Sequence, residues 1–200
     1  MTASSPPAWT PGAPLRLESE RFVLRSLGAD DVTDRYLAWL DDPEVTRFLY
    51  SGGLRRTRAD VEAYVARHDN RTSFHLGIFA KEGGDHIGNY SFGCDSVHRV
   101  AQINVMIGDR AWWKKRVVNE TRAAILDFLF GPMDMLKVAG TPYARNVAAV
   151  YNYQSQHFGI EGVLRDHRLL QDGTRSDVIC FAMFRADWLS RRQADAAARS

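Results

Sequence analysis

A cluster of basic residues lies between a strand-like run and a helix-like run. The stretch AWWKKRVVNE, residues 111–120, carries Lys114, Lys115 and Arg116 between the apolar runs INVMIG and ETRAAILDFLF. The amino end of a helix offers unpaired N–H groups and partial positive charge, so such a junction is a typical phosphate-binding position. Loops of this kind usually contain glycine, which lets the backbone approach a ligand closely. Because this loop has none, two interpretations stay open: a phosphate cradle that replaces glycine with charge, or a solvated basic turn.

Four titratable side chains are candidates for proton transfer. Asp95 and His98 lie in the turn CDSVHR between two strand-like runs, a place that could face a bound molecule. His75 lies within a strand, where a single histidine is more often packed than catalytic. Glu120 is explained as an acid favoured in the first turn by the helix dipole. The sequence assigns none of them as general base, and a chain of water molecules is a further alternative.

The composition excludes several classes of protein. The 26 Lys and Arg residues nearly balance the 24 Asp and Glu residues, which argues against binding nucleic acid through bulk charge. The sequence contains no apolar run long enough for a membrane span, and its first residues lack the features of a signal peptide. The patterns GxxxxGK[ST] and GxGxxG are absent, which disfavours an NTPase or a dinucleotide enzyme.

The two cysteines predict neither a disulfide framework nor a metal site. Cys94 and Cys180 both lie in strand-like sequence, and no cysteine or histidine spacing is typical of zinc ligands. We expect buried thiols, no metal and a reducing compartment, the cytoplasm.

The hydrophobic pattern predicts one α+β domain over residues 15–188, with a mixed central sheet and helices on both faces. A disordered lead-in of residues 1–14 precedes it, and a polar tail of residues 189–200 follows. The first helix is expected to begin after an Asp30 N-cap, with Val32, Tyr36, Leu37 and Leu40 on its apolar face, and to end at Asp42-Pro43. Further helices are expected at 57–68, 120–130 and 146–158, and strands at 15–27, 73–81, 85–94, 100–108, 136–144, 162–170 and 175–184.

These segments together resemble the GNAT superfamily of acyl-CoA-dependent N-acetyltransferases, most closely its RimJ/RimL-like branch. The resemblance covers residues 17–188 and implies a single-domain GNAT fold. It rests on LRSLGADDVTDRYLAWLDDPEVTRFL, INVMIGDRAWW and NVAAVYNYQSQHFGIEGVLRD. In the last of these, the most specific, Asn146, Ala149, Tyr153 and Phe158 match the residue types of the family.

The acetyl-CoA loop departs from the family pattern, Gln/Arg-x-x-Gly-x-Gly/Ala. In the aligned loop, Trp113 takes the first place, Arg116 the first glycine and Val118 the second. Lys114 stands where the branch often has a further glycine, and His157 replaces the glycine before the phenylalanine of the next helix. The glycine loop is therefore degenerate.

The resemblance implies roles for particular residues. Tyr153 is the family-matched general acid for the leaving thiolate, and Asn146 would contact the cofactor besides capping its helix. Tyr151 lies on a different helix face and is a weaker candidate. Gln102 stands where many relatives carry a strand glutamate. The residues expected to hold acetyl-CoA are Val105 and Ile107 at a strand edge, Trp113, Lys114, Lys115, Arg116, Val118 and Asn119 in the loop and helix start, and Asn146.

The resemblance thus implies an N-acetyltransferase with acetyl-CoA as donor and no metal. Its acceptor would be a small primary amine, either a nucleotide-linked amino sugar or a protein N-terminus, and the protein would be a monomer or homodimer. Two alternatives stay open: a catalytically silent GNAT-fold binding module, suggested by the missing glycines, and an enzyme of the same fold that uses another acyl donor.

Overall fold

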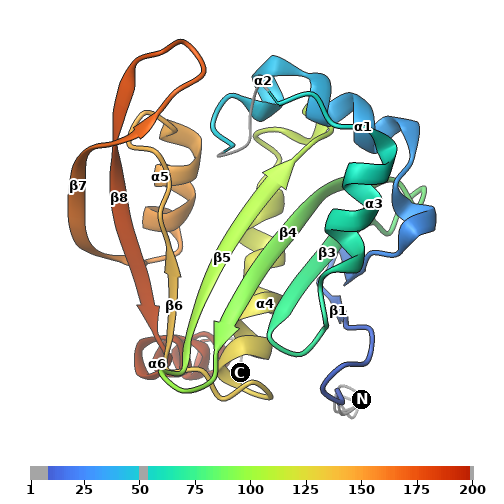
Figure 1. Cartoon of the computed structure of the whole chain (residues 1–200). Helices are drawn as coiled ribbons and strands as arrows, with labels where there is room; N and C mark the ends of the chain where they lie inside the picture. The colour runs from blue at the N-terminus through green and yellow to red at the C-terminus, as the bar shows by residue number, and fades with distance from the viewer. Residues whose placement is uncertain (1–8, 50–53, 199–200) are drawn as a thin grey trace.

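The structure, a computed structural model, describes residues 9–49 and 54–198 (Figure 1). Its strands are β1 (Arg16–Glu18), β2 (Phe22–Ser26), β3 (Ser73–Ala80), β4 (His86–Asp95), β5 (Val100–Ile107), β6 (Lys137–Gly140), β7 (Gly159–Leu169) and β8 (Arg175–Phe184). Its α-helices are α1 (Asp34–Asp41), α2 (Pro43–Thr46), α3 (Arg58–Ala66), α4 (Val117–Phe130), α5 (Val147–Ser155) and α6 (Arg185–Ala197). Two short 3₁₀ helices, η1 (Ala29–Asp31) and η2 (Arg110–Trp112), precede α1 and α4.

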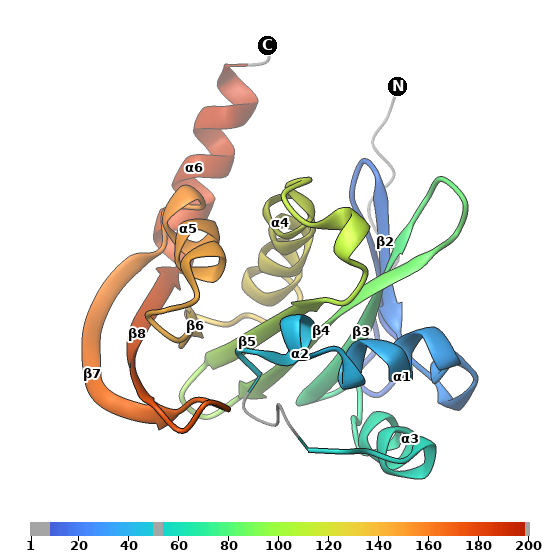
Figure 2. The same cartoon turned by 90° about the horizontal axis from the view of Figure 1, so that it is seen from above.

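The strands form one mixed sheet in the order β1-β2-β3-β4-β5-β6-β8-β7. Neighbouring strands are antiparallel except β5 and β6, which are parallel. Helices α4 and α5 lie on one face and α1, α2 and α3 on the other, as the view from above shows (Figure 2). The predicted α+β domain with helices on both faces is confirmed.

The parallel strands β5 and β6 pair over only three residues. Val100, Ala101 and Gln102 face Lys137, Val138 and Ala139. In the described part of the chain, β5 then continues to Ile107 with no strand paired on that edge. The sheet therefore opens between β5 and β6, and Figure 1 shows the two strands separating toward their carboxyl ends.

Two hydrophobic clusters hold the helices on the sheet. The larger lies between the sheet and α4 and includes the fully buried Phe22, Leu24, Tyr90 and Ile125. The smaller holds α1 and α3 on the opposite face. It is made of Val32, Tyr36, Trp39, Val61 and Val65, with Leu37 and Leu40 packed against it. The predicted apolar face of the first helix is thus confirmed, with Trp39 added to it.

The predicted N-cap of the first helix is wrong. Asp30 lies in η1, and the Thr33 hydroxyl caps α1 by accepting from the Tyr36 amide at 3.3 Å. The acidic pair at residues 30 and 31 instead belongs to this separate short helix, in which the Asp31 carboxylate accepts from the Gly28 amide. The main helix therefore starts three residues later than the sequence indicated.

Both predicted flanking segments contain ordered structure. Residues 1–8 of the expected lead-in lie outside the described residues, but the Trp9 ring packs edge-on against Phe128 at 5.2 Å. The expected tail continues α6 as far as Ala197, because buried Trp188 and an ion pair from Arg192 to Asp127 fasten that helix to α4. Cys94 is buried as predicted, whereas Cys180 is only partly buried.

Candidate active site

The glycine-free loop has the backbone conformation that glycine would favour. Lys114 and Arg116 have φ angles of 63° and 58°, in the left-handed region that most side chains avoid. His157, the third residue at a glycine position, has a φ of 63°. The loop therefore keeps the shape of a glycine-containing turn although its side chains disfavour it.

This loop leads directly into the amino end of α4. Arg116 occupies the N-cap position, and no side chain of the described residues caps the helix there. In the described part of the chain, no hydrogen bond reaches the amides of Val117, Val118 or Asn119. The side chains of Val117 and Val118 are buried, so neither stands between these amides and a ligand. The helix thus presents unpaired N–H groups and its positive dipole end at the loop.

Glu120 fastens the loop to the β1–β2 turn. Its carboxylate accepts hydrogen bonds from the Arg21 amide and the Ser19 hydroxyl at 2.7 Å and from the Arg21 guanidinium at 2.8 Å. Arg21 also donates to the Lys115 carbonyl at 3.0 Å, so one side chain links loop and helix. Burial opposes ionisation of Glu120, but these bonds outweigh it and hold its pKa below the ordinary value.

The two tryptophans of the loop pack against the sheet and the basic side chains. Trp112 meets the Phe22 ring edge-on at 5.4 Å, and the Lys115 ammonium lies 5.1 Å from the Trp112 ring centre. The Trp113 indole donates to the Ile107 carbonyl at 2.9 Å. Of the strand-edge groups predicted to bind acetyl-CoA, the Ile107 carbonyl is therefore already engaged by Trp113.

The open edge of β5 leaves backbone groups available beyond its pairing with β6. The Ile103 and Ile107 carbonyls accept from Tyr153 and Trp113, so both point away from β4. Alternate residues of an antiparallel strand direct their polar groups to the same edge, and Val105 therefore points there as well. No strand pairs with Val105 on that edge within the described residues. The predicted position of Val105 at an accessible strand edge agrees with this geometry.

Tyr153 reaches from α5 to the point where β5 and β6 separate. Its hydroxyl lies 3.5 Å from the Ile103 carbonyl oxygen, a long hydrogen bond. On the other strand, a Cβ atom at Gly140 would overlap this hydroxyl, so β6 passes the tyrosine only because it has glycine there. Burial raises the pKa of Tyr153, and the nearby positive charge of Arg122 acts in the opposite direction. The hydroxyl therefore stays protonated at neutral pH.

Two asparagines that were predicted to contact acetyl-CoA form hydrogen bonds within the protein, namely Asn146 and Asn119. The Asn146 side chain accepts from the Ala149 amide at 3.1 Å, which confirms it as the N-cap of α5. The Asn119 side chain donates to the Ser155 hydroxyl at 2.9 Å and so joins α4 to α5. Tyr151 is exposed on the other side of α5, away from the tyrosine at the strand separation.

Three of the four base candidates suggested by the sequence have structural roles, and the fourth, His98, is exposed in the β4–β5 turn. The Asp95 carboxylate accepts from the amides of Val97 and His98 and closes the β4–β5 turn, at the end of the sheet where β5 and β6 are still paired. His75 is buried, as expected for a packed histidine, with its Nε2 atom 3.1 Å from the Tyr36 hydroxyl. The Glu120 carboxylate already accepts hydrogen bonds from Ser19 and Arg21.

A small cavity lies on the opposite face of β5, beside α3. His75, Ser91 and Asn104 stand next to one another across β3, β4 and β5. A cavity of about 170 Å³ borders the last two of these and is lined by Tyr64, His68, Ser73, Ser91, Phe92, Gly93 and Asn104. Sequence reasoning did not select His68, which lies just after the helix and matches no motif.

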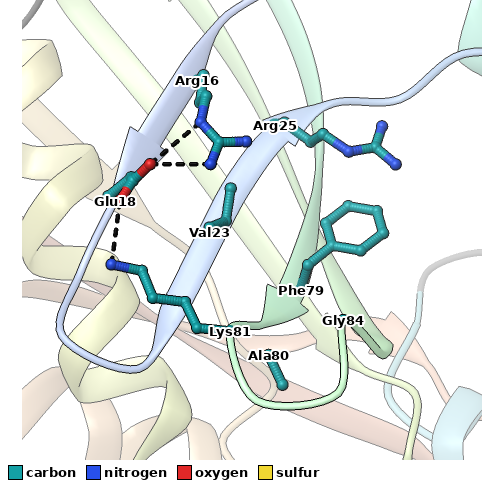
Figure 3. Close-up of a pocket in the computed structure, with 8 residues that line it drawn as sticks. All are labelled: Arg16, Glu18, Val23, Arg25, Phe79, Ala80, Lys81 and Gly84. Atoms are coloured by element: carbon teal, nitrogen blue, oxygen red, sulfur yellow. Dashed lines mark hydrogen bonds and ion pairs between the residues drawn. The ribbon is translucent and has the colours of Figure 1, made fainter.

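A larger hollow of about 540 Å³ lies on β1, β2 and β3, away from the open edge of β5 (Figure 3). Its basic groups already have acidic partners. Glu18 pairs with both Arg16 and Lys81, and Arg25 pairs with Asp31. Each of the three cations that line the hollow thus already contacts a carboxylate among the described residues, with Glu18 shared by two of them.

The open strand edge, the loop that leads into a helix start and the buried tyrosine are the features in which the sequence resembles acyl-CoA-dependent N-acetyltransferases. Comparison with known families agrees, because the model of the Acetyltransferase (GNAT) domain matches residues 21–158. The chain belongs to this family, and the predicted N-acetyltransferase with acetyl-CoA as its donor is confirmed at this level.

Named relatives differ in what they are described to act on. The chain is 23% identical over 176 residues to an uncharacterized N-acetyltransferase p20 of Bacillus licheniformis, covering 86% of this chain and 97% of that one. Spermidine N-acetyltransferase from Vibrio cholerae, solved with CoA and spermine, has a TM-score of 0.75 at 17% identity and covers 84% and 98% of the two chains. The acetyltransferase from Salmonella typhimurium that modifies the N-terminal serine of ribosomal protein L7/L12 has a TM-score of 0.72 at 17% identity and covers 83% and 96%.

The residues that the structure describes include neither a cluster of potential metal ligands nor a helix with the length and apolar character of a membrane span.

Proposed function

We propose that this protein acetylates the amino group of a small, hydroxyl-rich acceptor such as an amino sugar, with Tyr153 as the proton donor to the leaving thiolate. The observation that carries the proposal is the position of the Tyr153 hydroxyl between Ile103 of β5 and Gly140 of β6. This places a proton donor at the point where β5 and β6 separate.

The groups that would hold acetyl-CoA have the required chemistry. Val105 offers a free N–H and C=O pair at the open edge of β5, suited to the amides of the pantetheine arm. The amides at the start of α4 offer donors to the pyrophosphate, and exposed Lys114 and Arg116 add positive charge. The thioester would then lie along β5 near Tyr153.

Acetyl transfer requires proton movements at both ends of the reaction. The amine must lose a proton, because most alkyl amines are protonated at neutral pH, and the departing thiolate must gain one. The raised pKa of Tyr153 keeps its proton available for the second step. Asn146 supports this role indirectly, since it caps the helix that carries the tyrosine.

The lining of the cavity beside β5 supports the choice of acceptor. Its polar side chains are hydroxyl, amide and imidazole groups, and no carboxylate lines it in the described part of the chain. A polyamine would be held best by acidic groups, whereas a sugar is held by hydrogen bonds and by packing on an aromatic ring such as Tyr64. A protein N-terminus is the second acceptor that the family resemblance suggests.

The test is a two-stage assay of the purified chain. Acetyl-CoA should raise the melting temperature, because a ligand bound only by the native state stabilises it by about 2.7 kcal/mol at 100 times its Kd. Release of free thiol should then be measured with free and nucleotide-linked amino sugars, polyamines and peptides with free N-termini. Binding without turnover on any amine would support the silent module, and turnover only with another acyl-CoA would support a different donor. Faster acetylation of polyamines or peptides than of amino sugars would overturn the acceptor class.

A further inference from the structure

The cavity beside β5 contains a histidine whose hydrogen bonds fix its tautomer. The Nδ1 atom of His68 lies 2.8 Å from the Tyr64 carbonyl oxygen and 3.3 Å from that of Val65. A carbonyl only accepts hydrogen bonds, so Nδ1 must carry the proton. In the neutral ring the remaining nitrogen, Nε2, therefore has a free lone pair.

This lone pair has no partner among the residues that the structure describes. Across residues 9–49 and 54–198, no hydrogen bond involves the Nε2 atom of His68. The side chain is partly buried and lines the cavity together with Ser91 and Asn104. Asn104 lies on β5, one residue from Val105, and its side chain points to the cavity face of that strand. The cavity thus connects the histidine to the strand along which the thioester would lie.

The surroundings of His68 favour its neutral form. The ring stacks on His75 of β3 with 5.1 Å between ring centres and meets the Tyr64 ring edge-on at 4.9 Å. Burial lowers the pKa of His68, and Arg67 adds to this effect, while the Tyr64 and Val65 carbonyls and Asp69 oppose it. His75 is itself held neutral, with a pKa lowered to about 3 by burial, and bonds to Tyr36 of α1.

We infer that His68 is the general base of the reaction and takes up at Nε2 the proton that the acceptor amine releases. This inference rests on the proposed acetyl transfer. His68 takes one proton from the alkylammonium group of the acceptor, directly or through one water in the cavity, and the neutral nitrogen then bonds to the acetyl carbonyl carbon and gives up its second proton to solvent. The carbon–sulfur bond breaks, and the thiolate receives the proton of the Tyr153 hydroxyl. Solvent then takes the proton from His68 and returns one to Tyr153.

No other described side chain around this cavity competes well for the role. Besides His68, only Tyr64 among the lining residues titrates, and a phenol is a poor proton acceptor at neutral pH. The neighbouring strand position that faces the same side as Asn104 is Gln102, whose amide donates to the Thr141 hydroxyl at 3.3 Å and cannot act as a base.

The decisive variant is His68→Asn. The asparagine amide replaces Nδ1–H as a donor to the Tyr64 carbonyl but removes the nitrogen that would accept the proton. We expect kcat/KM to fall by about 10²–10⁴-fold with an alkyl amine acceptor. Acetyl-CoA should still raise the melting temperature of the variant as it does for the wild type. Added imidazole should restore part of the rate, and the acidic limb of the wild-type pH profile should disappear.

Two comparisons separate this inference from its rivals. An acceptor amine of low pKa, already neutral at the assay pH, should lose far less rate in His68→Asn than an alkyl amine does. His98→Asn tests the exposed turn histidine as the alternative base. The inference is overturned if His68→Asn keeps the wild-type pH profile, if both amines lose rate equally, or if His98→Asn alone removes the acidic limb. Failure of the wild type to acetylate any amine would instead contradict the proposed function.

Discussion

The guanidinium of Arg122 lies 4.2 Å from the centre of the Tyr153 ring. Arg122 is almost completely buried at 1% exposure, and the Phe181 ring stacks on the same tyrosine with 5.0 Å between ring centres. The Nη1 atom of Arg122 donates to the Gln156 side chain at 2.8 Å and, more weakly, to the Asn152 carbonyl. Helix α4 therefore holds a cation against the tyrosine of α5.

This cation has no acidic partner among the described residues, and its Nε atom is buried without a hydrogen bond. Burying an arginine in this way costs stability, and replacing such groups by apolar residues of similar size is often neutral or stabilising. A positive charge beside a phenol, however, would stabilise the phenolate that the proposed proton transfer from Tyr153 leaves behind. The arrangement is explained better by this effect on Tyr153 than by stability.

Arg122→Met should therefore lower kcat by about 10–100-fold, because each unit by which the variant raises the pKa of Tyr153 corresponds to about 1.4 kcal/mol. The free energy of unfolding should stay nearly unchanged, because the variant replaces a buried charge by an apolar side chain of similar size. Arg122→Lys, which keeps the charge, should retain more activity than the methionine variant. The measurement is a double-mutant cycle with Tyr153→Phe. If Arg122→Met slows the Tyr153→Phe enzyme as much as it slows the wild type, the arginine does not act through the tyrosine.

Tyr153→Phe should by itself lower kcat by about 10²–10⁴-fold, because the variant keeps the packed ring but lacks the proton donor. Acetyl-CoA affinity should change by less than about twofold, since the one hydrogen bond of the hydroxyl within the described residues is long, at 3.5 Å. Steady-state kinetics and calorimetry on the same preparation measure both quantities. Exposed Tyr151→Phe is the matched control and should leave both unchanged. A loss of activity below twofold in Tyr153→Phe would remove this residue from the reaction.

The sequence predicted the sheet, the main helices and the loop before α4 because their hydrophobic periodicity and turn residues are local signals. It also selected Tyr153, whose position matches a family motif. Arg122 and His68 have no such signal. Arg122 sits in an apolar helix where its burial depends on how α5 crosses α4, and the role of His68 depends on a strand 36 positions further along, at Asn104. The engagement of the Ile107 carbonyl by Trp113 likewise follows only from the folded loop.

The ion pair between Glu120 and Arg21 should make the loop sensitive to acid. The pKa of Glu120 is lowered in the folded protein, so its contribution to stability is present above the ordinary carboxyl pKa and is lost as pH falls through the folded value. Glu120→Gln should therefore destabilise the protein at pH 7 by about 1–3 kcal/mol and have less effect in acid. Denaturant melts of both proteins between pH 3 and pH 7 test this. A pH-independent difference between them would show that the charge of Glu120 contributes nothing.

Glu120→Gln should also weaken acetyl-CoA binding at pH 7, because Arg21 links Glu120 to the Lys115 carbonyl in the loop. Calorimetric titrations of wild type and Glu120→Gln at pH 7 measure this effect separately from stability. Equal affinities would mean that the loop keeps its shape without the ion pair.

Substitutions at Arg116 can separate the charge of the loop from its backbone conformation. Arg116→Gly and Arg116→Ala remove the same charge, but only glycine is relaxed at a φ of 58°. The glycine variant should therefore be more stable than the alanine variant by about 1 kcal/mol. Both should weaken acetyl-CoA binding at low salt and flatten its salt dependence, because exposed charges near phosphate are screened by ions. The same differences in stability and in acetyl-CoA binding are expected between Lys114→Gly and Lys114→Ala, because Lys114 has a φ of 63°.

Calorimetry at about 20 mM and 300 mM salt measures these effects, with Arg191→Ala on α6 as a control for the loss of one positive charge far from the loop. If Arg116→Gly binds acetyl-CoA more tightly than the wild type at both salt concentrations, the arginine obstructs the phosphate, and the loop has lost function with its glycines. If neither Arg116 variant differs from the control, the basic run is a solvated turn and binding depends on the α4 amides alone. Weaker binding at low salt that converges with the wild type at high salt is the expected result, because the loop would then hold phosphate with a glycine-like backbone and add charge from the side chains that replaced glycine.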